Sequence, residues 1–200
     1  METIRTENIL KALDNNEFKM YLQFIVDSNT RKIVSAETIS RWVSPQYGII
    51  GPISYIENME SSGLISRHDF YMFESACQQL EKWSNTEYKD IAISCNFTRI
   101  TLSEEDCIDK LKNILEKYNF DKSKLAIEIT EDFMEKNREI AQRNVMLCKE
   151  LGLKIHLDDL GCGYTSLVNL CDYPIDVVKI DREILLKTNT EKGKRYLQVL

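Results

Sequence analysis

Residues 154–167 read Lys-Ile-His-Leu-Asp158-Asp159-Leu-Gly161-Cys-Gly163-Tyr-Thr-Ser-Leu. Two adjacent carboxylates, Asp158 and Asp159, therefore follow a short apolar run and come just before a turn that contains two glycines. Placing two desolvated negative charges at the end of a strand is unfavourable unless a cation lies between them. We expect a metal site here, with further oxygen ligands supplied by other parts of the chain.

Strand-like and helix-like segments alternate on both sides of this stretch. The sequence predicts strands over residues 18–26, 32–37, 90–96, 125–129, 153–157 and 176–180. It predicts helices up to Asn15, over 70–83, from Ser103 with Asp106 completing a capping box, over 141–151, near 166–171 and from Thr190. The first two strands read as an antiparallel hairpin around residues 27–30. The later strand–helix repeats have short loops, and they require parallel strands covered on both faces.

Polar residues decide between the two arrangements open to such repeats, an open doubly wound sheet and a closed barrel. One polar residue lies at or near the C-terminal end of each of five predicted strands: Glu37, Asn96, Glu128, Asp158 and Lys179. In a barrel these ends converge on one mouth, where active sites of this fold lie. In an open sheet only the residues beside the switch point could meet. We therefore expect an α/β fold of the (β/α)₈ barrel type.

The predicted ligands are carboxylate and amide oxygens, with no His or Cys among them. Such a set favours Mg²⁺ or Mn²⁺ and disfavours Zn²⁺. Asp158 and Asp159 could serve two cations, which is the arrangement that stabilises the attacking and leaving oxygens during displacement at phosphorus. Lys179 would place its own positively charged ammonium group at the same mouth of the barrel. There it could orient or deprotonate a metal-bound water molecule.

Each of these residues also has a purely structural interpretation. Glu37 and Glu128 taken singly could be solvated strand-end carboxylates, Asn96 a turn residue, and Asp158-Asp159 an N-cap and turn. Lys179 could pair with Asp176 or Asp181. His68 and His156 belong to no ligand spacing, and we interpret both as structural. The distribution of the polar set over successive strands is what favours a shared site.

Composition excludes several other classes of protein. The formal net charge is −6 and Lys and Arg form no blocks, which argues against binding to a nucleic acid polymer or an anionic membrane. No stretch reaches the ~18 apolar residues needed to span a bilayer. The six cysteines include no C-x-x-C pair and fit a reducing, cytoplasmic location.

Five segments, in order and at matching intervals, are similar to those of one known family. They are residues 35–42 (SAETISRW), 94–98 (SCNFT), 127–131 (IEITE), 158–167 (DDLGCGYTSL) and 174–181 (PIDVVKID). Together they resemble the EAL domain, the cyclic di-GMP phosphodiesterase module of bacterial signalling, from Phe18 onward. The resemblance implies a (β/α)₈ barrel with one antiparallel strand, which agrees with the predicted hairpin. It also implies hydrolysis of cyclic di-GMP to linear pGpG.

The resemblance assigns a role to individual residues. Glu37, Asn96, Glu128 and Asp158 would hold one divalent metal, and Asp158 with Asp159 would contribute to a second. Lys179 would contact the nucleophilic water, so that the catalytic set is Lys179, Glu37 and Asp159. Gln23 and Arg41 would contact the bound dinucleotide, Arg41 through a phosphate. Glu131 would steady the loop from Leu160 to Leu167, which the family links to metal binding and to dimerisation.

The sequence departs from the family pattern in its details and in its length. The eponymous triplet is Glu37-Thr38-Ile39, the usual proline after Gln23 is Phe24, and the usual Phe and Thr at 160 and 162 are Leu and Cys. A complete barrel takes ~250 residues. We therefore expect a single EAL-type domain over residues 1–200 with about six of eight strands, an incomplete second metal site and impaired activity. We also expect a homodimer, and a sensory or GGDEF domain in a longer parent protein.

Two functional classes stay open at this point. The intact ligand set favours a metal-dependent phosphodiesterase. The incomplete second metal site favours a catalytically inactive receptor for cyclic di-GMP, or a protein-interaction module. A barrel enzyme that acts on sugars through paired carboxylates is a weaker alternative, because it leaves Asn96 and Lys179 without a role.

Overall fold

A computed structural model describes residues 4–134, 139–161 and 173–187 of the chain. Within these ranges the strands are β1 (Phe18–Val26), β2 (Ile33–Ser44), β3 (Gly48–Ile50), β4 (Ala92–Asn96), β5 (Leu125–Thr130), β6 (Lys154–Leu160) and β7 (Val177–Ile180). The helices are α1 (Thr6–Asp14), α2 (Ile56–Ser62), α3 (Ile65–Trp83), α4 (Arg99–Leu102), α5 (Cys107–Leu115), α6 (Glu139–Glu150) and α8 (Arg182–Lys187). Short 3₁₀ turns are η1 (Pro52–Ser54), η2 (Lys122–Lys124) and η3 (Glu131–Met134).

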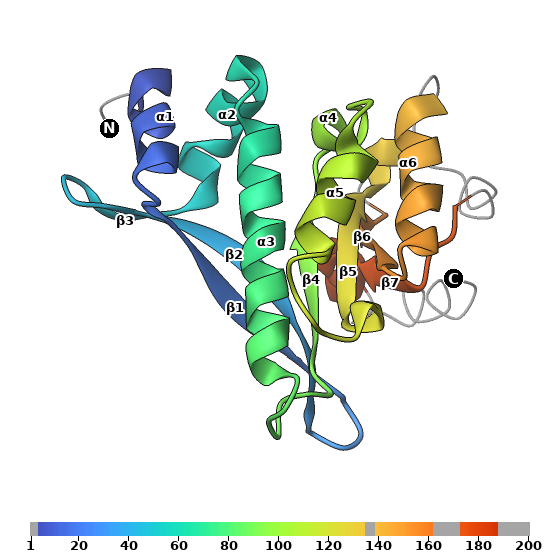
Figure 1. The fold of residues 1–200 in the computed structure, drawn as a ribbon. Helices are drawn as coiled ribbons and strands as arrows, with labels where there is room; N and C mark the ends of the chain where they lie inside the picture. The colour runs from blue at the N-terminus through green and yellow to red at the C-terminus, as the bar shows by residue number, and fades with distance from the viewer. Residues whose placement is uncertain (1–3, 135–138, 162–172, 188–200) are drawn as a thin grey trace.

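The described strands form one sheet in the order β1-β2-β4-β5-β6-β7, with β3 paired to β2 beside this path. The first pair, β1 and β2, is antiparallel, and every later neighbour on the path is parallel. Figure 1 shows the long β1–β2 hairpin crossing one side of the molecule and β7 beyond β6. The sheet is not closed within the described residues, so the expected incomplete barrel with one antiparallel strand is confirmed.

Apolar side chains hold the helices against one face of the sheet. Helices α3, α5 and α6 lie along the strands (Figure 1), and their apolar stripes join the strand residues in one core. β5 is buried from Leu125 to Ile129, as expected for a parallel strand covered on both faces. Alternation along β2 buries Ala36 and Thr38 and turns Glu37 to the opposite face. That opposite face therefore carries the polar residues of the strands.

Two sequence expectations need correction. No helix begins at Ser103, because this residue follows the last residue of α4 and its hydroxyl donates to the Arg99 carbonyl oxygen in that helix, and the next helix begins at Cys107. Thr98 is the side chain that caps α4. β2 continues to Ser44, so Glu37 lies within this strand and not near its end.

Two further expectations concern the ends of the predicted elements. β6 runs on to Leu160, with its register broken between Leu157 and Leu160, so Asp158 and Asp159 lie inside the strand. The helices expected near residues 166–171 and from Thr190 lie outside the described residues. No helix in the described ranges has the length and apolar character needed to cross a membrane.

Candidate metal centre and adjoining pocket

Three of the predicted ligands meet on the polar face of the sheet. Glu37 of β2, Glu128 of β5 and Asp158 of β6 each place one carboxylate oxygen within 4.8 Å of the other two. Parallel pairing sets this geometry, because Asn96 of β4 lies opposite Glu128 and Thr130 of β5 lies opposite Asp158. Residues from strands distant in the sequence thereby converge at one point.

Lys179 of β7 lies among the three carboxylates. Its Nζ is 2.6 Å from Glu128 Oε1, 2.8 Å from Glu37 Oε2 and 3.6 Å from Asp158 Oδ2. Burial lowers the pKa of Lys179, but the charges and hydrogen-bonding contacts of Glu128 and Glu37 outweigh it and raise this pKa above its ordinary value. The side chain is therefore an ammonium ion that balances part of the negative charge.

The buried carboxylates differ in their electrostatics. Burial raises the pKa of Glu128, but the neighbouring His156 and Lys179 outweigh it and hold that pKa below its ordinary value. The pKa of Asp158 is raised, mainly by burial and also by the charge of Glu128, in spite of Lys179. Glu128 is thus the more strongly anionic of the two.

The donor set fits a divalent cation. Glu128 has a side chain that is 0% exposed, and among the described residues neither of its oxygens has a well-directed hydrogen-bond donor, although Oε1 lies in the ion pair with Lys179. Burying a carboxylate without hydrogen-bond donors costs free energy unless a positively charged partner binds its oxygens. Hard oxygen donors are those that Mg²⁺ and Mn²⁺ bind, so the residues fit the predicted group.

Asn96 completes the ligand group that the sequence predicts. Its Nδ2 donates to Glu37 Oε1 at 2.9 Å, so the amide oxygen is directed away from this contact. The hydrogen bond also fixes one oxygen of Glu37, while the other faces Lys179. An amide oxygen is a ligand of the same hard class as the carboxylates.

Asp159, Gln23 and Arg41 lie outside this group. Asp159 is exposed with a backbone φ of 55°, and its N–H donates to Asp158 Oδ1 at 3.0 Å. Gln23 faces Glu37 across the β1–β2 pair and is exposed. Arg41 lies further along the same face of β2 and donates to the Ser40 carbonyl oxygen at 2.9 Å. Their predicted roles at a second metal and at the dinucleotide stay predictions.

Glu131 holds the start of the segment that follows Asp159. This buried carboxylate accepts a hydrogen bond from the Gly161 N–H at 2.9 Å. Gly161 has a φ of 102°, which is strained for any other residue, and a Cβ built there would lie 1.9 Å from Ile184 Cδ1 and force that side chain to move. This contact agrees with the predicted loop-stabilising role of Glu131, although residues 162–167 of that loop lie outside the described residues.

A pocket of about 360 Å³ adjoins the carboxylates, and both Glu37 and Asn96 line it. Its other walls are mostly apolar and include Ile39, Pro52 and Met72. A flat, largely apolar group attached to a ligand at the carboxylates could enter this space.

Asp69 of α3 lies at the wall of the same pocket and is only 4% exposed. Its Oδ2 accepts hydrogen bonds from the Thr98 N–H at 3.0 Å, the Thr98 hydroxyl at 2.9 Å and the Thr101 hydroxyl at 2.6 Å. Thr98 follows Asn96 by two residues. Asp69 therefore fixes the turn that presents Asn96, and nothing in the sequence pattern of α3 indicates this role.

His156 is the second residue that the sequence interpretation missed, because it was assigned a purely structural role. Its Nδ1 lies 3.5 Å from Glu128 Oε1. The signal was present, since strand residues two apart share a face and His156 precedes Asp158 by two.

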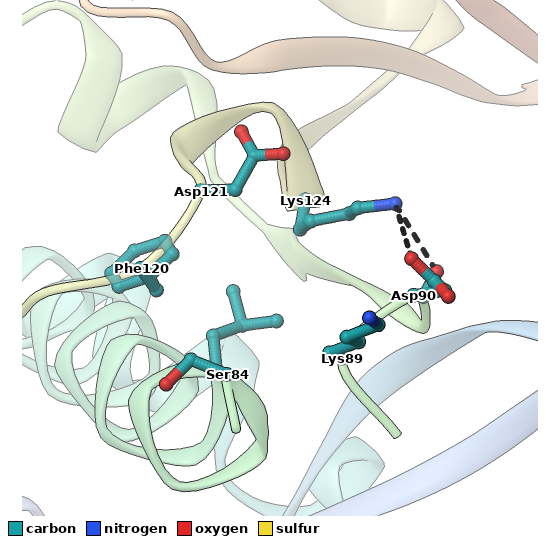
Figure 2. Close-up of a pocket in the computed structure, with 7 residues that line it drawn as sticks. Ser84, Lys89, Asp90, Phe120, Asp121 and Lys124 are labelled. Atoms are coloured by element: carbon teal, nitrogen blue, oxygen red, sulfur yellow. Dashed lines mark hydrogen bonds and ion pairs between the residues drawn. The ribbon is translucent and has the colours of Figure 1, made fainter. Parts of the chain in front are cut away.

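A second cavity of about 300 Å³ lies where β4 and β5 begin, and none of the three carboxylates lines it. Figure 2 shows Phe120 and Ser84 on its walls, with Lys124 directed toward Asp90. Lys124 Nζ lies 3.4 Å from the Asp90 carbonyl oxygen. None of the predicted site residues lines this cavity.

Known proteins match the chain over most of its length. The model of the EAL domain family matches residues 6–198. Cyclic di-GMP phosphodiesterase PdeR of Escherichia coli K12 is 31% identical over 175 residues, which are 88% of this chain and 26% of PdeR. The chain thus spans about a quarter of the length of the curated relatives it matches.

Solved structures agree with this match. The EAL enzyme Bd1971, with cAMP and cyclic di-GMP bound, has a TM-score of 0.84 and 28% identity, over 95% of this chain and 53% of its own. An EAL domain protein from Listeria monocytogenes EGD-e has a TM-score of 0.77 and 27% identity, over 100% of this chain and 77% of its own. On the family match, the shared fold and the converging carboxylates, the chain belongs to the EAL domain family.

Proposed function

We propose that this chain is a metal-dependent phosphodiesterase that hydrolyses one phosphodiester bond of cyclic di-GMP to give linear pGpG. The observation that carries the proposal is the group of three carboxylates within 4.8 Å of one another, with Lys179 among them. PdeR, a relative that is 31% identical, is named as a phosphodiesterase for this dinucleotide.

The proposed cofactor is Mg²⁺ or Mn²⁺, held by Glu37, Asn96, Glu128 and Asp158, with a second ion near Asp158 and Asp159. When bound, such a cation supplies a Lewis acid for the phosphate oxygens. Lys179 is proposed to orient the attacking water and to hold negative charge that develops at phosphorus. Its distances of 2.6 and 2.8 Å to Glu128 and Glu37 support this role, because they place its ammonium beside two of the proposed metal ligands.

The rest of the dinucleotide would lie along the polar face of the sheet. Gln23 lies opposite Glu37, and Arg41 follows on the same face of β2, where its guanidinium could bind a phosphate. The 360 Å³ pocket between Ile39, Pro52 and Met72 would take a guanine base, because its walls are mostly apolar, with polar groups such as Asp69 among them, and Glu37 lines it. Glu131 is proposed to keep the segment from Leu160 in place through the Gly161 N–H.

We propose further that residues 1–200 act as one EAL-type domain, as a homodimer, within a parent protein that also carries a sensory or GGDEF domain. Exposed Tyr21 and Phe24 on the edge strand β1 would suit an interface, and light scattering of the purified chain tests the dimer. A cytoplasmic location is proposed because the four cysteines in the described ranges are free and buried.

Incubation with cyclic di-GMP and Mg²⁺ or Mn²⁺, followed by chromatography for pGpG, tests the proposed activity. We expect product only when the cation is present and none in EDTA. A matched control is Glu139→Gln, which changes an exposed carboxylate of α6 and should leave the rate unchanged. Binding of the dinucleotide without product would refute hydrolysis and select the receptor interpretation.

A further inference from the structure

His156 occupies a defined place beside the carboxylates. It lies opposite Glu128 in the β5–β6 register and two residues before Asp158, so its side chain lies on the polar face of the sheet. The side chain is 15% exposed, and its Nδ1 is 3.5 Å from Glu128 Oε1. The imidazole is therefore held against a carboxylate that water does not reach.

The buried carboxylate of Glu128 needs a second hydrogen-bonding partner besides Lys179 to stabilise and orient it. Its side chain is 0% exposed, and the nearest cation, Lys179, is shared with Glu37 and Asp158. A carboxylate that binds a metal through one oxygen is oriented by a hydrogen bond to the other oxygen, and losing such an outer partner typically weakens metal binding about 10–100-fold.

The charge of the donor matters as well. A divalent cation and the Lys179 ammonium repel each other, so the ammonium should be drawn away from Glu128 Oε1 when the cation binds. A neutral imidazole suffers much weaker repulsion. With the proton on Nδ1 it can donate to Oε1 next to a bound cation, and the 3.5 Å contact needs only a small shift to become a hydrogen bond.

We propose that His156 is a positioning residue for Glu128, donating from Nδ1 to Oε1 so that Oε2 is directed to the divalent cation. This inference rests on the proposed function, because it assigns the outer partner of a proposed metal ligand. It makes His156 a determinant of metal affinity that acts through another residue.

Isothermal titration calorimetry of the purified chain with Mn²⁺ and with Mg²⁺ tests the proposal. We expect His156→Ala to bind Mn²⁺ about 10–100-fold more weakly. We expect His156→Asn to recover most of the affinity, because its amide N–H lies where Nδ1 lies in histidine. Lys154→Ala, on the same strand two residues earlier and 45% exposed, is the matched control and should leave the affinity unchanged.

A spectroscopic readout separates positioning from a general loss of structure. The chain contains only two histidines, so imidazole ¹⁵N spectra can be assigned with His156→Asn. Adding Mg²⁺ should shift the signals of His156 and keep its Nδ1 protonated, while those of His68 stay in place. If His156→Ala fails to fold, the Asn variant and these spectra still decide the question.

The outcomes distinguish this inference from the proposed function. A wild-type chain that binds neither ion would refute the metal centre and the inference together. Wild-type binding with an unchanged affinity in a folded His156→Ala, or with His156 signals that do not respond to Mg²⁺, would overturn the inference alone.

Discussion

Replacing Lys179 with Met should destabilise the metal-free protein and make its stability depend on a divalent cation. The ammonium lies 2.6 Å from Glu128 and 2.8 Å from Glu37, and 3.6 Å from Asp158. Methionine keeps much of the aliphatic stem and removes the charge. Three carboxylates would then face one another without the cation that separates them.

The expected magnitude follows from the burial of the partners. Removing one member of a fully buried ion pair costs about 3–5 kcal/mol, because the other charge is left unpaired. Glu128 is 0% exposed, but Glu37 and Asp158 are 24% and 22% exposed, so water screens part of the repulsion. We therefore expect a loss of about 2–3 kcal/mol in EDTA.

Binding of a divalent cation should restore most of the free energy of unfolding that Lys179→Met loses. At a free concentration one hundred times its Kd, a ligand stabilises the folded state by about 2.7 kcal/mol. The gain should be larger in Lys179→Met than in the wild type, because the cation there replaces the missing positive charge and no ammonium repels it.

Urea unfolding, followed by circular dichroism in EDTA and in MnCl₂, measures both effects. Lys154→Met is the control, since this lysine is 45% exposed and its ion pair with Asp176 should contribute less than about 1 kcal/mol. The reasoning is refuted if Lys179→Met and the wild type unfold at the same urea concentration in EDTA.

Three further predictions concern single residues. Glu128→Gln should reduce the rate of pGpG formation at least about 100-fold, because it removes a charged ligand of the centre, and chromatography should detect no residual rate above about a hundredth of wild type. Gly161→Ala should cost about 1–3 kcal/mol, since the added Cβ would meet Ile184 at 1.9 Å and φ is 102°, whereas Gly51→Ala has open space and should unfold in urea like the wild type. Asp176→Asn should cost about 1 kcal/mol at pH 7, because two lysine ammonium groups and a backbone N–H outweigh burial and hold the pKa of this carboxyl below its ordinary value. A lowered pKa stabilises the fold above the ordinary value near ~3.9, so the difference from wild type should shrink in urea titrations as the pH falls below it.

Much of the fold could be predicted because its signals are local. Period-3.6 apolar residues identified α3 and α6, and short apolar runs identified the strands on the path from β1 to β7. β3 was missed because it has only three residues, Gly48–Ile50, and pairs only with β2. The helix expected from Ser103 exists as α5, but its predicted start was wrong, because Ser103 lies at the C-terminal end of α4 and its hydroxyl donates to the Arg99 carbonyl oxygen.

The sequence predicted which residues form the site, but it did not predict which of their side chains contact one another. Parallel strands bring their polar ends together, so Glu37, Glu128 and Asp158 were expected to meet, and they do. The sequence did not show that Lys179 pairs with the ligands and not with Asp176, which binds Lys149 and Lys154 instead. Such partners depend on sheet register and helix packing, which no local pattern encodes.

The position of Lys179 bears on the order of events in the cell. Many metal sites are assembled only when the ion arrives, because their ligands repel one another without it. Here the chain supplies its own positive charge at the place where the ligands converge. Folding and metal loading are then separate steps. A shortage of Mg²⁺ or Mn²⁺ would lower the proposed activity while the amount of folded protein stayed the same.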